Sequence, residues 1–318
     1  MTATSAPPVT SNTQRPARNA RAGRWGWLPS LGMASPPAVL VLIFVGVPIV
    51  IGVLYTLGYT GGLNSVASTL AVQTYPAVGA GPTLAAYSVV FADATFRANL
   101  IVTVWVTVVT VLVVTVIAWA VALYTRLAGG WLGRFISGVA IIPLFIPIVI
   151  GAYAIRQFYG STGFPVSLGR LMGIDVPVWT LHTQGIVVGQ IWASLPFAVL
   201  LISSGLAAVP DSLIDAARDT GASLARAVWS VMLPMATVPT VIVATFTGVG
   251  VMGSFTVPYL IGPASPNMLG VALQQTYASF ARPQNAQVMA VVMFAMAGLI
   301  GAAYVWANAR QAKQSAVI

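Results

Sequence analysis

The stretch at residues 209–234 reads VPDSLIDAARDTGASLARAVWSVMLP, and it separates two long apolar runs. Its first half predicts a short helix. Pro210 and the hydroxyl of Ser212 form a helix start signal, because a Ser oxygen can accept a hydrogen bond from an orphan N–H of the first turn. Asp215 places negative charge near the positive end of the helix dipole, and Arg218 follows at a spacing that allows an ion pair.

The second half of this stretch predicts a sharp turn and another short helix. Ala216, Ala217 and Gly221 form a face with almost no side-chain bulk, and Gly221 suits the left-handed position that ends a helix. Ser223 can start the second helix, and the pair Leu233-Pro234 turns the chain into the next apolar run. We therefore expect two short helices that lie on one surface of a membrane.

Long charge-free apolar runs lie on both sides of this stretch. The chain is 58% hydrophobic and 6% charged, whereas a soluble domain carries roughly 25% charged residues. A bilayer core of ~30 Å needs roughly 20 apolar residues per spanning helix. The expected spans are 37–57, 99–125, 135–155, 184–208, 235–257 and 287–307. The sequence thus predicts an all-α integral membrane protein with about six transmembrane helices.

The basic residues set the orientation. The chain has 14 Lys and Arg against 5 acidic residues, a net charge of +9, and the basic residues gather at the ends of the apolar runs. Such charges bind anionic lipid headgroups at ~1 kcal/mol each, so we expect membrane lipid and no nucleic acid as a partner. With the N-terminus in the cytoplasm, the external segments hold only Arg97, Arg170 and Arg282, which satisfies the positive-inside rule. Both termini and residues 209–234 are therefore predicted to be cytoplasmic.

Two regions fall outside the six spans. Residues 1–36 are polar and Arg-rich and lack apolar periodicity, which predicts a disordered basic cytoplasmic tail before a membrane domain at 37–318. Residues 258–280 are charge-free, and a seventh span there would place Arg310 and Lys313 outside. We expect this segment to be external or re-entrant, because irregular backbone at membrane depth is tolerated only where protein buries it.

The spacing within residues 209–234 resembles a family signature. Asp215-Ala216-Ala217, three residues, Gly221, nine residues, then Val-Met-Leu-Pro is similar to the loop of binding-protein-dependent ABC importer permeases of the type I fold. That signature reads Glu-Ala-Ala, three residues, Gly, nine residues, Ile, one residue, Leu-Pro, so here Asp replaces Glu and Val replaces Ile. The resemblance extends over residues 37–310.

The resemblance implies a coupling helix between spans four and five that docks on an ATPase. It gives the contact with the ATPase to Asp215, Ala216, Ala217, Arg218 and Gly221, and the orientation of the next span to Leu233 and Pro234. The implied partners are two ATPase subunits, a second permease subunit and an extracytoplasmic solute-binding protein at the bacterial inner membrane.

The energy source is expected on another chain. No Gly-x-x-x-x-Gly-Lys-Ser/Thr loop occurs, and Lys313 is the only lysine, so the chain cannot hold ATP as P-loop proteins do. The resemblance implies that ATP and Mg²⁺ bind the partner ATPase. We expect this chain to be no enzyme, with no catalytic residue, metal or cofactor of its own.

Span five is unusually small and polar, and the resemblance gives it a place in the translocation path. Phe246, Gly250, Met252 and Phe255 are the candidates for the path or its gate. An equally simple interpretation is that the glycines only permit close helix packing.

The substrate is the least determined property. Residues 253–262 and 268–275 are similar to permeases of the spermidine/putrescine type, so a polyamine is one candidate. Sugar and other small-solute permeases share the architecture and are the alternative. An ion-coupled secondary transporter is a rival of a different class, which is disfavoured because no charged residue falls centrally in an expected span.

Overall fold

The computed structural model describes residues 28–79 and 81–315, which form helices and no β-strand. The helices are α1 (Leu28–Val41), η1 (Leu42–Gly46), α2 (Val47–Thr56), η2 (Gly62–Asn64), α3 (Ser65–Thr69), α4 (Ala85–Ala92), α5 (Ala94–Leu127), α6 (Gly130–Ile141), η3 (Ile142–Phe145), α7 (Ile148–Phe158), α8 (Phe164–Met172), α9 (Thr183–Ala207), α10 (Asp211–Asp219), α11 (Leu224–Ala227), η4 (Val228–Met232), α12 (Leu233–Met235), α13 (Thr237–Met252), α14 (Thr256–Ile261), α15 (Leu269–Gln274), η5 (Gln275–Ser279) and α16 (Pro283–Ser315).

The described residues divide into two compact units. The first contains α1, η1 and the start of α2 up to Val50, and the second begins at Ile51. Most of the expected tail at 1–36 lies outside the described residues. Its last part is helical, because α1 begins at Leu28.

The prediction of about six membrane spans is confirmed. Four helices are long and apolar enough to cross a bilayer, namely Ser35–Thr56, Ala94–Leu127, Thr183–Ala207 and Pro283–Trp306. Two bent helix pairs, Gly130–Phe145 with Ile148–Phe158 and Leu224–Met235 with Thr237–Met252, raise the number to six if each pair is one span. All six overlap the expected positions.

The two spans expected at 135–155 and 235–257 are bent. The first is broken between Phe145 and Ile148, with a bend of 112°. Ile146 there has φ −100° and ψ 123°, the extended conformation that a residue before proline favours. The second pair bends by 67°, and α13 ends at Met252, so residues 253–257 do not continue it.

The second unit is organised around α5. Along α5 the buried side chains recur every three or four residues, which places them on one face of the helix. This face consists of Phe96, Asn99, Thr103, Val106, Thr107, Thr110, Val114, Ala118 and Ala122. Most of these residues are small or hydroxylated, so α9 and α13 can approach α5 closely.

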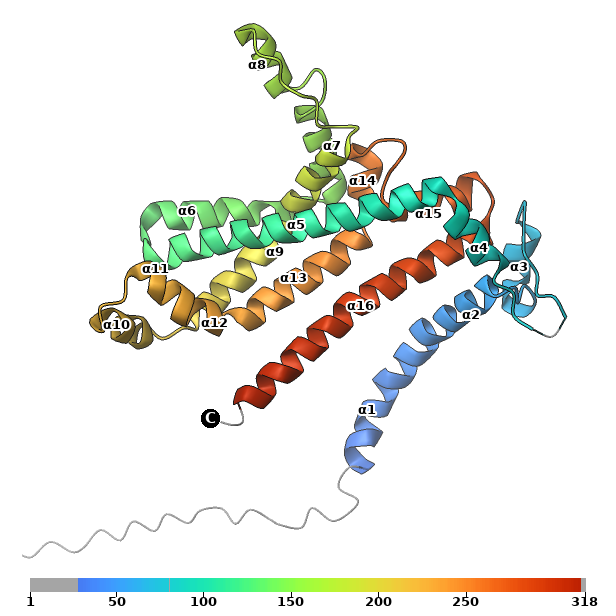
Figure 1. The fold of residues 1–318 in the computed structure, drawn as a ribbon, viewed down its shortest axis with the longest axis horizontal. Helices are drawn as coiled ribbons and strands as arrows, with labels where there is room; N and C mark the ends of the chain where they lie inside the picture. The colour runs from blue at the N-terminus through green and yellow to red at the C-terminus, as the bar shows by residue number, and fades with distance from the viewer. Residues whose placement is uncertain (1–27, 80, 316–318) are drawn as a thin grey trace, which may run out of the picture. The chain divides into compact units, whose positions relative to one another are not determined.

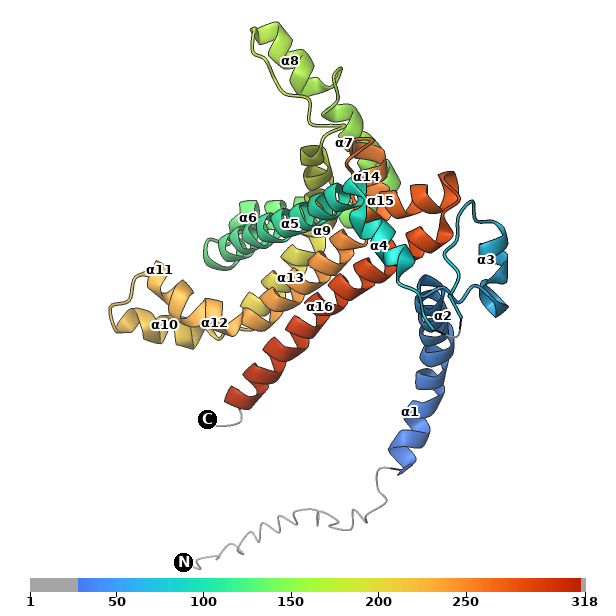
Figure 2. The ribbon, with the colours of Figure 1, turned by 45° about the vertical axis from the view of Figure 1, so that its right-hand side comes forward.

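Helices α5, α6, α9, α13 and α16 run side by side in both views (Figure 1 and Figure 2). Helices α10 to α12 lie at one end of these helices, and α4 and α15 lie at the other. The α7–α8 segment projects away from them. Residues 209–234 and the segment that follows α13 are therefore at opposite ends of the unit.

Residues 258–280 do not form a seventh span. Helices α14 and α15 have 6 residues each, too few to cross a bilayer. The last part of the turn between them, from Asn267, is buried against α5. There Asn99 Oδ1 accepts from the Asn267 backbone N–H at 2.9 Å and Thr103 Oγ1 accepts from the Leu269 N–H at 2.8 Å. Asn267 in turn donates its amide to the carbonyls of Pro258 and Pro263. The side chains of α5 thus satisfy the irregular backbone of this segment.

Candidate functional site

The start of α10 differs from the expected cap. The N-cap residue is Pro210, no side chain caps the helix, and Ser212 is the second helical residue. The prediction that Ser212 caps the helix was therefore wrong. The proline explains the start without a cap, since it has extended backbone angles and its own missing N–H leaves one donor fewer to satisfy.

Arg126, near the end of α5, holds the base of α10. Its Nη2 donates to the carboxylate of Asp211 and, at 3.1 Å, to the carbonyl of Val209, and its Nε donates to the carbonyl of Leu206 at 3.3 Å. Leu206 lies in the last turn of α9 and Val209 follows its end, the region where a helix leaves acceptors without an intrahelical donor. Arg126 is one of the basic residues at the ends of the apolar runs. Its partners could not be predicted from the sequence, because they are far away along the chain.

The body of α10 has one face turned inward and one turned outward. Ile214 is buried in the same apolar core as Ala227 and Met232, and Ala217 packs against that core. Asp215 and Ala216 are exposed. The core side of α10 thus anchors it to α9 and the segment before α13. The small-residue face expected from the sequence included Ala217, which instead is half-buried and packs against the core.

Arg218 is also exposed. Among the described residues, the one ion pair joins Arg126 and Asp211. The pair that the spacing of Asp215 and Arg218 allows is therefore not formed. The charged groups of Asp215 and Arg218 are exposed and unpaired on the outer surface of α10.

The end of α10 confirms the expected turn at Gly221. Gly221 has φ +85°, a left-handed conformation that costs a residue with a Cβ. Its N–H donates to the Arg218 carbonyl at 2.9 Å, and the Ala222 N–H donates to the Ala217 carbonyl at 3.2 Å. This pair of bonds is the Schellman motif. Apart from its two chain neighbours, no described residue has an atom within 4 Å of the position that a Cβ would take at Gly221, so the space beside it is open.

The chain after Gly221 forms the second short helix and then bends into α13. Ser223 Oγ accepts from the Arg226 N–H at 3.3 Å and caps α11, as predicted. At the bend, Leu233 is half-buried and Pro234 is exposed. The hydroxyl of Thr237 donates to the carbonyls of both residues, at 3.1 and 2.8 Å. The single proton of this hydroxyl is shared between the two carbonyls, which lie in the last turn before the bend, where a helix leaves acceptors unpaired.

An open groove of about 260 Å³ lies between α9 and α13. Its lining comprises Ser194, Phe197, Phe246, Thr247 and Gly250. The rings of Phe197 and Phe246 have centroids 6.0 Å apart and planes inclined by 45°. The groove therefore has an aromatic wall and an almost wholly apolar surface, and no charged side chain lines it. It brings together two of the four expected path residues.

The other two expected path residues lie elsewhere. Met252 is 5% exposed, so the surrounding chain encloses it and it does not line the groove. Phe255 lies beyond the end of α13 and stacks on Tyr259, with ring centroids 5.1 Å apart. The sequence could not indicate which face of α13 is open, because that depends on the neighbouring helices.

Metal-binding side chains do not gather anywhere in residues 28–79 and 81–315, where no group of three or more could hold an ion. The only histidine, His182, is the N-cap residue of α9, and its Nδ1 lies 3.0 Å from the carbonyl oxygen of Thr180. The contact joins two residues of the turn that precedes α9 and involves no other element.

Comparison with known families gives a match over most of the second unit. Residues 115–314 match the family described as binding-protein-dependent transport system inner membrane component. The match covers α10 to α13 together with α9 and α16.

Three relatives show the range of similar proteins. A probable ABC transporter permease protein of Pyrococcus horikoshii is 28% identical over 54% of this chain and 62% of its own length. The spermidine/putrescine transport system permease protein PotB of Haemophilus influenzae is 28% identical over 44% of this chain and 49% of its own. The trehalose transport system permease protein SugA of Mycobacterium tuberculosis is 29% identical over 76% of this chain and 75% of its own. The chain thus spans less than two thirds of the first two.

A solved structure shares the fold. A chain of a bacterial ABC transporter involved in the import of the acidic polysaccharide alginate superposes with a TM-score of 0.69 at 15% identity. The superposition covers 91% of this chain and 96% of that one.

Proposed function

We propose, because the chain belongs to the family of binding-protein-dependent transport system inner membrane components, that it forms half of the solute pathway of an ATP-driven importer. The chain is a multi-pass membrane protein and a permease subunit of the ABC importer class. In the proposed assembly, a second permease subunit completes the pathway, two ATPase subunits bind ATP and Mg²⁺, and an extracytoplasmic binding protein delivers the solute.

The surface of α10 is the observation that carries this proposal. Asp215, Ala216 and Gly221 leave an outer face of little bulk with open space beside it. The inner face is fixed to the core through Ile214, and the base is fixed through Arg126. A partner that displaces α10 therefore moves the core between α9 and α13, because packed interiors transmit strain. In this proposal α10 docks on the ATPase, and both termini are cytoplasmic.

The proposed mechanism is alternating access. Closure of the ATPase dimer favours one arrangement of the spans, and ATP shifts the population toward it only by binding that arrangement more tightly. The groove at Phe197 and Phe246 faces the second permease subunit in this scheme. Charged side chains of the described spans lie near their ends, which supports ATP rather than an ion gradient as the energy source.

A neutral polar solute such as a sugar fits the groove. Its lining presents the rings of Phe197 and Phe246 and no charged side chain. The similarity to a trehalose permease over three quarters of both chains supports this class.

A polyamine is the second candidate for the substrate. The aromatic pair could bind an ammonium group through its ring faces, and one relative is a spermidine/putrescine permease. The groove has no carboxylate to favour a cation. Uptake in vesicles with the native binding protein, measured with labelled trehalose and with labelled spermidine, distinguishes the two candidates.

The docking proposal is tested by a pair of charge reversals. Asp215→Lys should weaken recovery of the ATPase with the tagged permease from native membranes and should reduce ATP-driven uptake. Asp219→Lys, the same change at the last residue of α10, is the control, because a cation at the end of a helix is favoured by its dipole. Normal ATPase recovery and uptake with Asp215→Lys would contradict docking through this face, provided both variants reach the membrane equally.

A further inference from the structure

The α7–α8 segment leaves the long helices of the second unit sideways in both views (Figure 1 and Figure 2). Helix α7 is the second half of the bent third span and turns away from the first half by 112°. Residues 159–163 connect it to α8. Helix α8 therefore begins close to the point where span three reaches the bilayer surface.

Helix α8 has one face that packs within the chain and one that is open. Val166 and Gly169 are buried, and the chain that returns toward α9 lies too close to Gly169 for any side chain there. On the other face, Phe164, Leu168 and Leu171 are 63%, 43% and 86% exposed. Their spacing of four and then three residues places them on one side of the helix. A contiguous exposed apolar face of this kind indicates a protein or membrane contact.

Stacked rings join the open face of α8 to the end of α7. The ring of Phe158, the last residue of α7, lies with its centroid 5.9 Å from that of Phe164, and both residues are exposed. Ile150 and Ala154 are exposed as well. They precede Phe158 at intervals of four residues, which places all three on one face of α7. The exposed apolar surface is therefore continuous from the membrane-spanning half-helix α7 to α8.

The rings beside Phe158 are of the kinds that gather at membrane surfaces. Tyr159 packs edge to face against Phe158, with centroids 4.9 Å apart, and stacks on Trp179 with centroids 5.3 Å apart. Tyr and Trp are enriched at the headgroup level of bilayers, because an apolar ring with a polar tip suits that boundary. This cluster of rings indicates that the junction of α7 and α8 lies at the level of the lipid headgroups.

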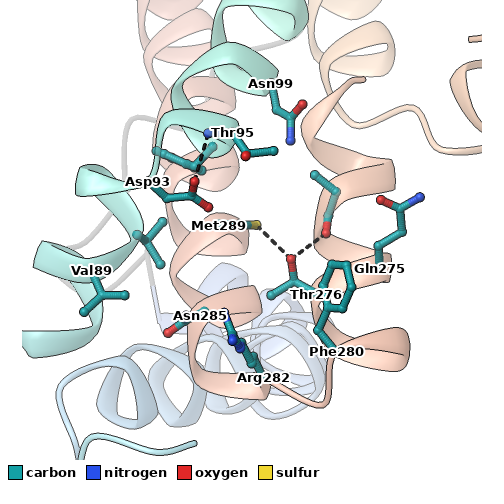
Figure 3. Close-up of a pocket in the computed structure, with 13 residues that line it drawn as sticks. Val89, Asp93, Thr95, Asn99, Gln275, Thr276, Phe280, Arg282, Asn285 and Met289 are labelled. Carbon is teal, nitrogen blue, oxygen red and sulfur yellow. Dashed lines mark hydrogen bonds between the residues drawn. The ribbon is translucent and has the colours of Figure 1, made fainter. Parts of the chain in front are cut away.

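A different composition marks the opening at the end of the unit opposite to α10. A cavity of about 500 Å³ lies there between α4, α5, η5 and α16. Figure 3 shows Asp93 and Arg282 on different sides of it, and both residues are exposed. Charged side chains thus border this opening, whereas the open face of α8 consists of large apolar side chains. The contrast favours lipid over water as the medium that covers α8.

We propose that α8 is an interfacial helix, which lies on the bilayer surface at which α7 ends and inserts Phe164, Leu168 and Leu171 among the lipids. Such a helix binds a membrane through the apolar area that it buries there. In the predicted orientation this is the outer surface. The anchored helix holds α7 in place, and α7 packs against α14, which follows the path helix α13. The proposal requires only that the chain spans a membrane, so it does not depend on the transport function.

Spin labels on single cysteines test this proposal, because the chain contains no cysteine of its own. Leu168→Cys and Leu171→Cys place a label on the open face. Arg170→Cys is the control, since it is exposed but lies two residues from Leu168 and so points elsewhere. The full chain, as isolated from native membranes, is reconstituted in vesicles of phosphatidylethanolamine and phosphatidylglycerol. Electron paramagnetic resonance then compares the collisions of each label with oxygen, which concentrates in lipid, and with a water-soluble nickel chelate.

We expect the labels at 168 and 171 to collide mainly with oxygen and the label at 170 mainly with the nickel chelate. A matched pair of substitutions, each combined with the label of Leu171→Cys, extends the test. Leu168→Gln puts a polar group into the apolar face and should raise nickel collisions several-fold. Arg170→Gln introduces the same side chain outside that face and should leave them unchanged. Both sites are exposed, so neither change should affect folding.

Three results would overturn the proposal. Frequent nickel collisions at all three labels would show that water covers the open face. Few collisions with either reagent at 168 and 171 would show that protein covers it, such as a second permease subunit or a binding protein. Equal effects of Leu168→Gln and Arg170→Gln would show that the apolar face does not hold α8 at the membrane. None of these readouts involves ATP hydrolysis or uptake, so this proposal and the transport function can fail separately.

Discussion

The guanidinium of Arg126 and the carboxylate of Asp211 form an ion pair that joins the end of α5 to the first residue of α10. The same guanidinium binds the carbonyls of Leu206 and Val209, which lead from α9 into α10. One side chain thus ties together two spans and the proposed coupling helix. This contact gives movement of α10 a direct route to α5, in addition to the apolar core beneath Ile214.

Replacement of Arg126 should therefore uncouple α10 from the spans. Arg126→Ala removes the donor from the Val209 carbonyl and the Asp211 carboxylate, whereas the Leu206 carbonyl keeps the Val209 N–H. Hydrogen bonds that involve a charged group contribute about 1.5–3 kcal/mol. We expect a loss of stability of about 2 kcal/mol and reduced uptake per ATP hydrolysed. The measurements are the unfolding temperature in detergent and the ratio of transport to hydrolysis in proteoliposomes.

Asp211→Asn is the matched control for that experiment. The Asp211 side chain is 74% exposed, and exposed ion pairs contribute less than about 1 kcal/mol. Its effect should be clearly smaller than that of Arg126→Ala. Equal effects of the two changes would mean that the ion pair, and not the carbonyl contacts, holds α10.

Two substitutions of Gly221 distinguish the effect of backbone strain from the effect of contact with a partner. A residue with a Cβ in the left-handed conformation costs about 1–2 kcal/mol, so Gly221→Val should lower stability by that amount. Gly221→Asn should cost less, since Asn tolerates this conformation. The space beside Gly221 is open in the chain itself, so neither side chain clashes internally.

Both variants should still lose ATPase recovery and uptake, because each side chain fills the space where the partner approaches. Co-purification of the ATPase measures this effect, with the amount of permease in the membrane as the reference. If Gly221→Asn transports normally and Gly221→Val does not, the glycine serves the turn alone.

Phe246 and Met252 should respond in different ways to truncation, although both belong to α13. Phe246 is 60% exposed and lines the groove, so Phe246→Ala should change stability little and raise ATP hydrolysis that does not require the binding protein. Met252 is 5% exposed, and Met252→Ala should lower stability by about 2–5 kcal/mol through the cavity it leaves. Basal hydrolysis and unfolding temperature, measured on both variants, distinguish a gate residue from a core residue. Unchanged basal hydrolysis with Phe246→Ala would remove it from the gate.

The orientation of the chain can be tested by reporter fusions. Fusions after Gly129 and Ala222 should give a cytoplasmic signal, and those after Thr69, Gly173 and Pro266 an external one. Pro266 lies in the turn between α14 and α15. A cytoplasmic signal there would contradict both the orientation and the assignment of residues 258–280 to the external side.

Several features were predictable from the sequence because they depend on local physics. The length of the apolar runs gave the six spans, since bilayer thickness sets the length that a helix needs. The turn at Gly221 and the cap at Ser223 followed from backbone conformation and short-range hydrogen bonds. The break in the third span was missed, although Pro147 marked a residue that disfavours helix at the position before it.

The sequence alone determined that the chain crosses a membrane, where it crosses, and that a glycine-ended helix precedes span five, because hydrophobicity and backbone preference act over a few residues. The tertiary structure alone decided that Arg126 holds Asp211, that Asn99 supports the turn before α15, and that Phe246 is open while Met252 is enclosed. These contacts join residues far apart in the chain. They depend on how tightly whole helices pack, which no single apolar run specifies.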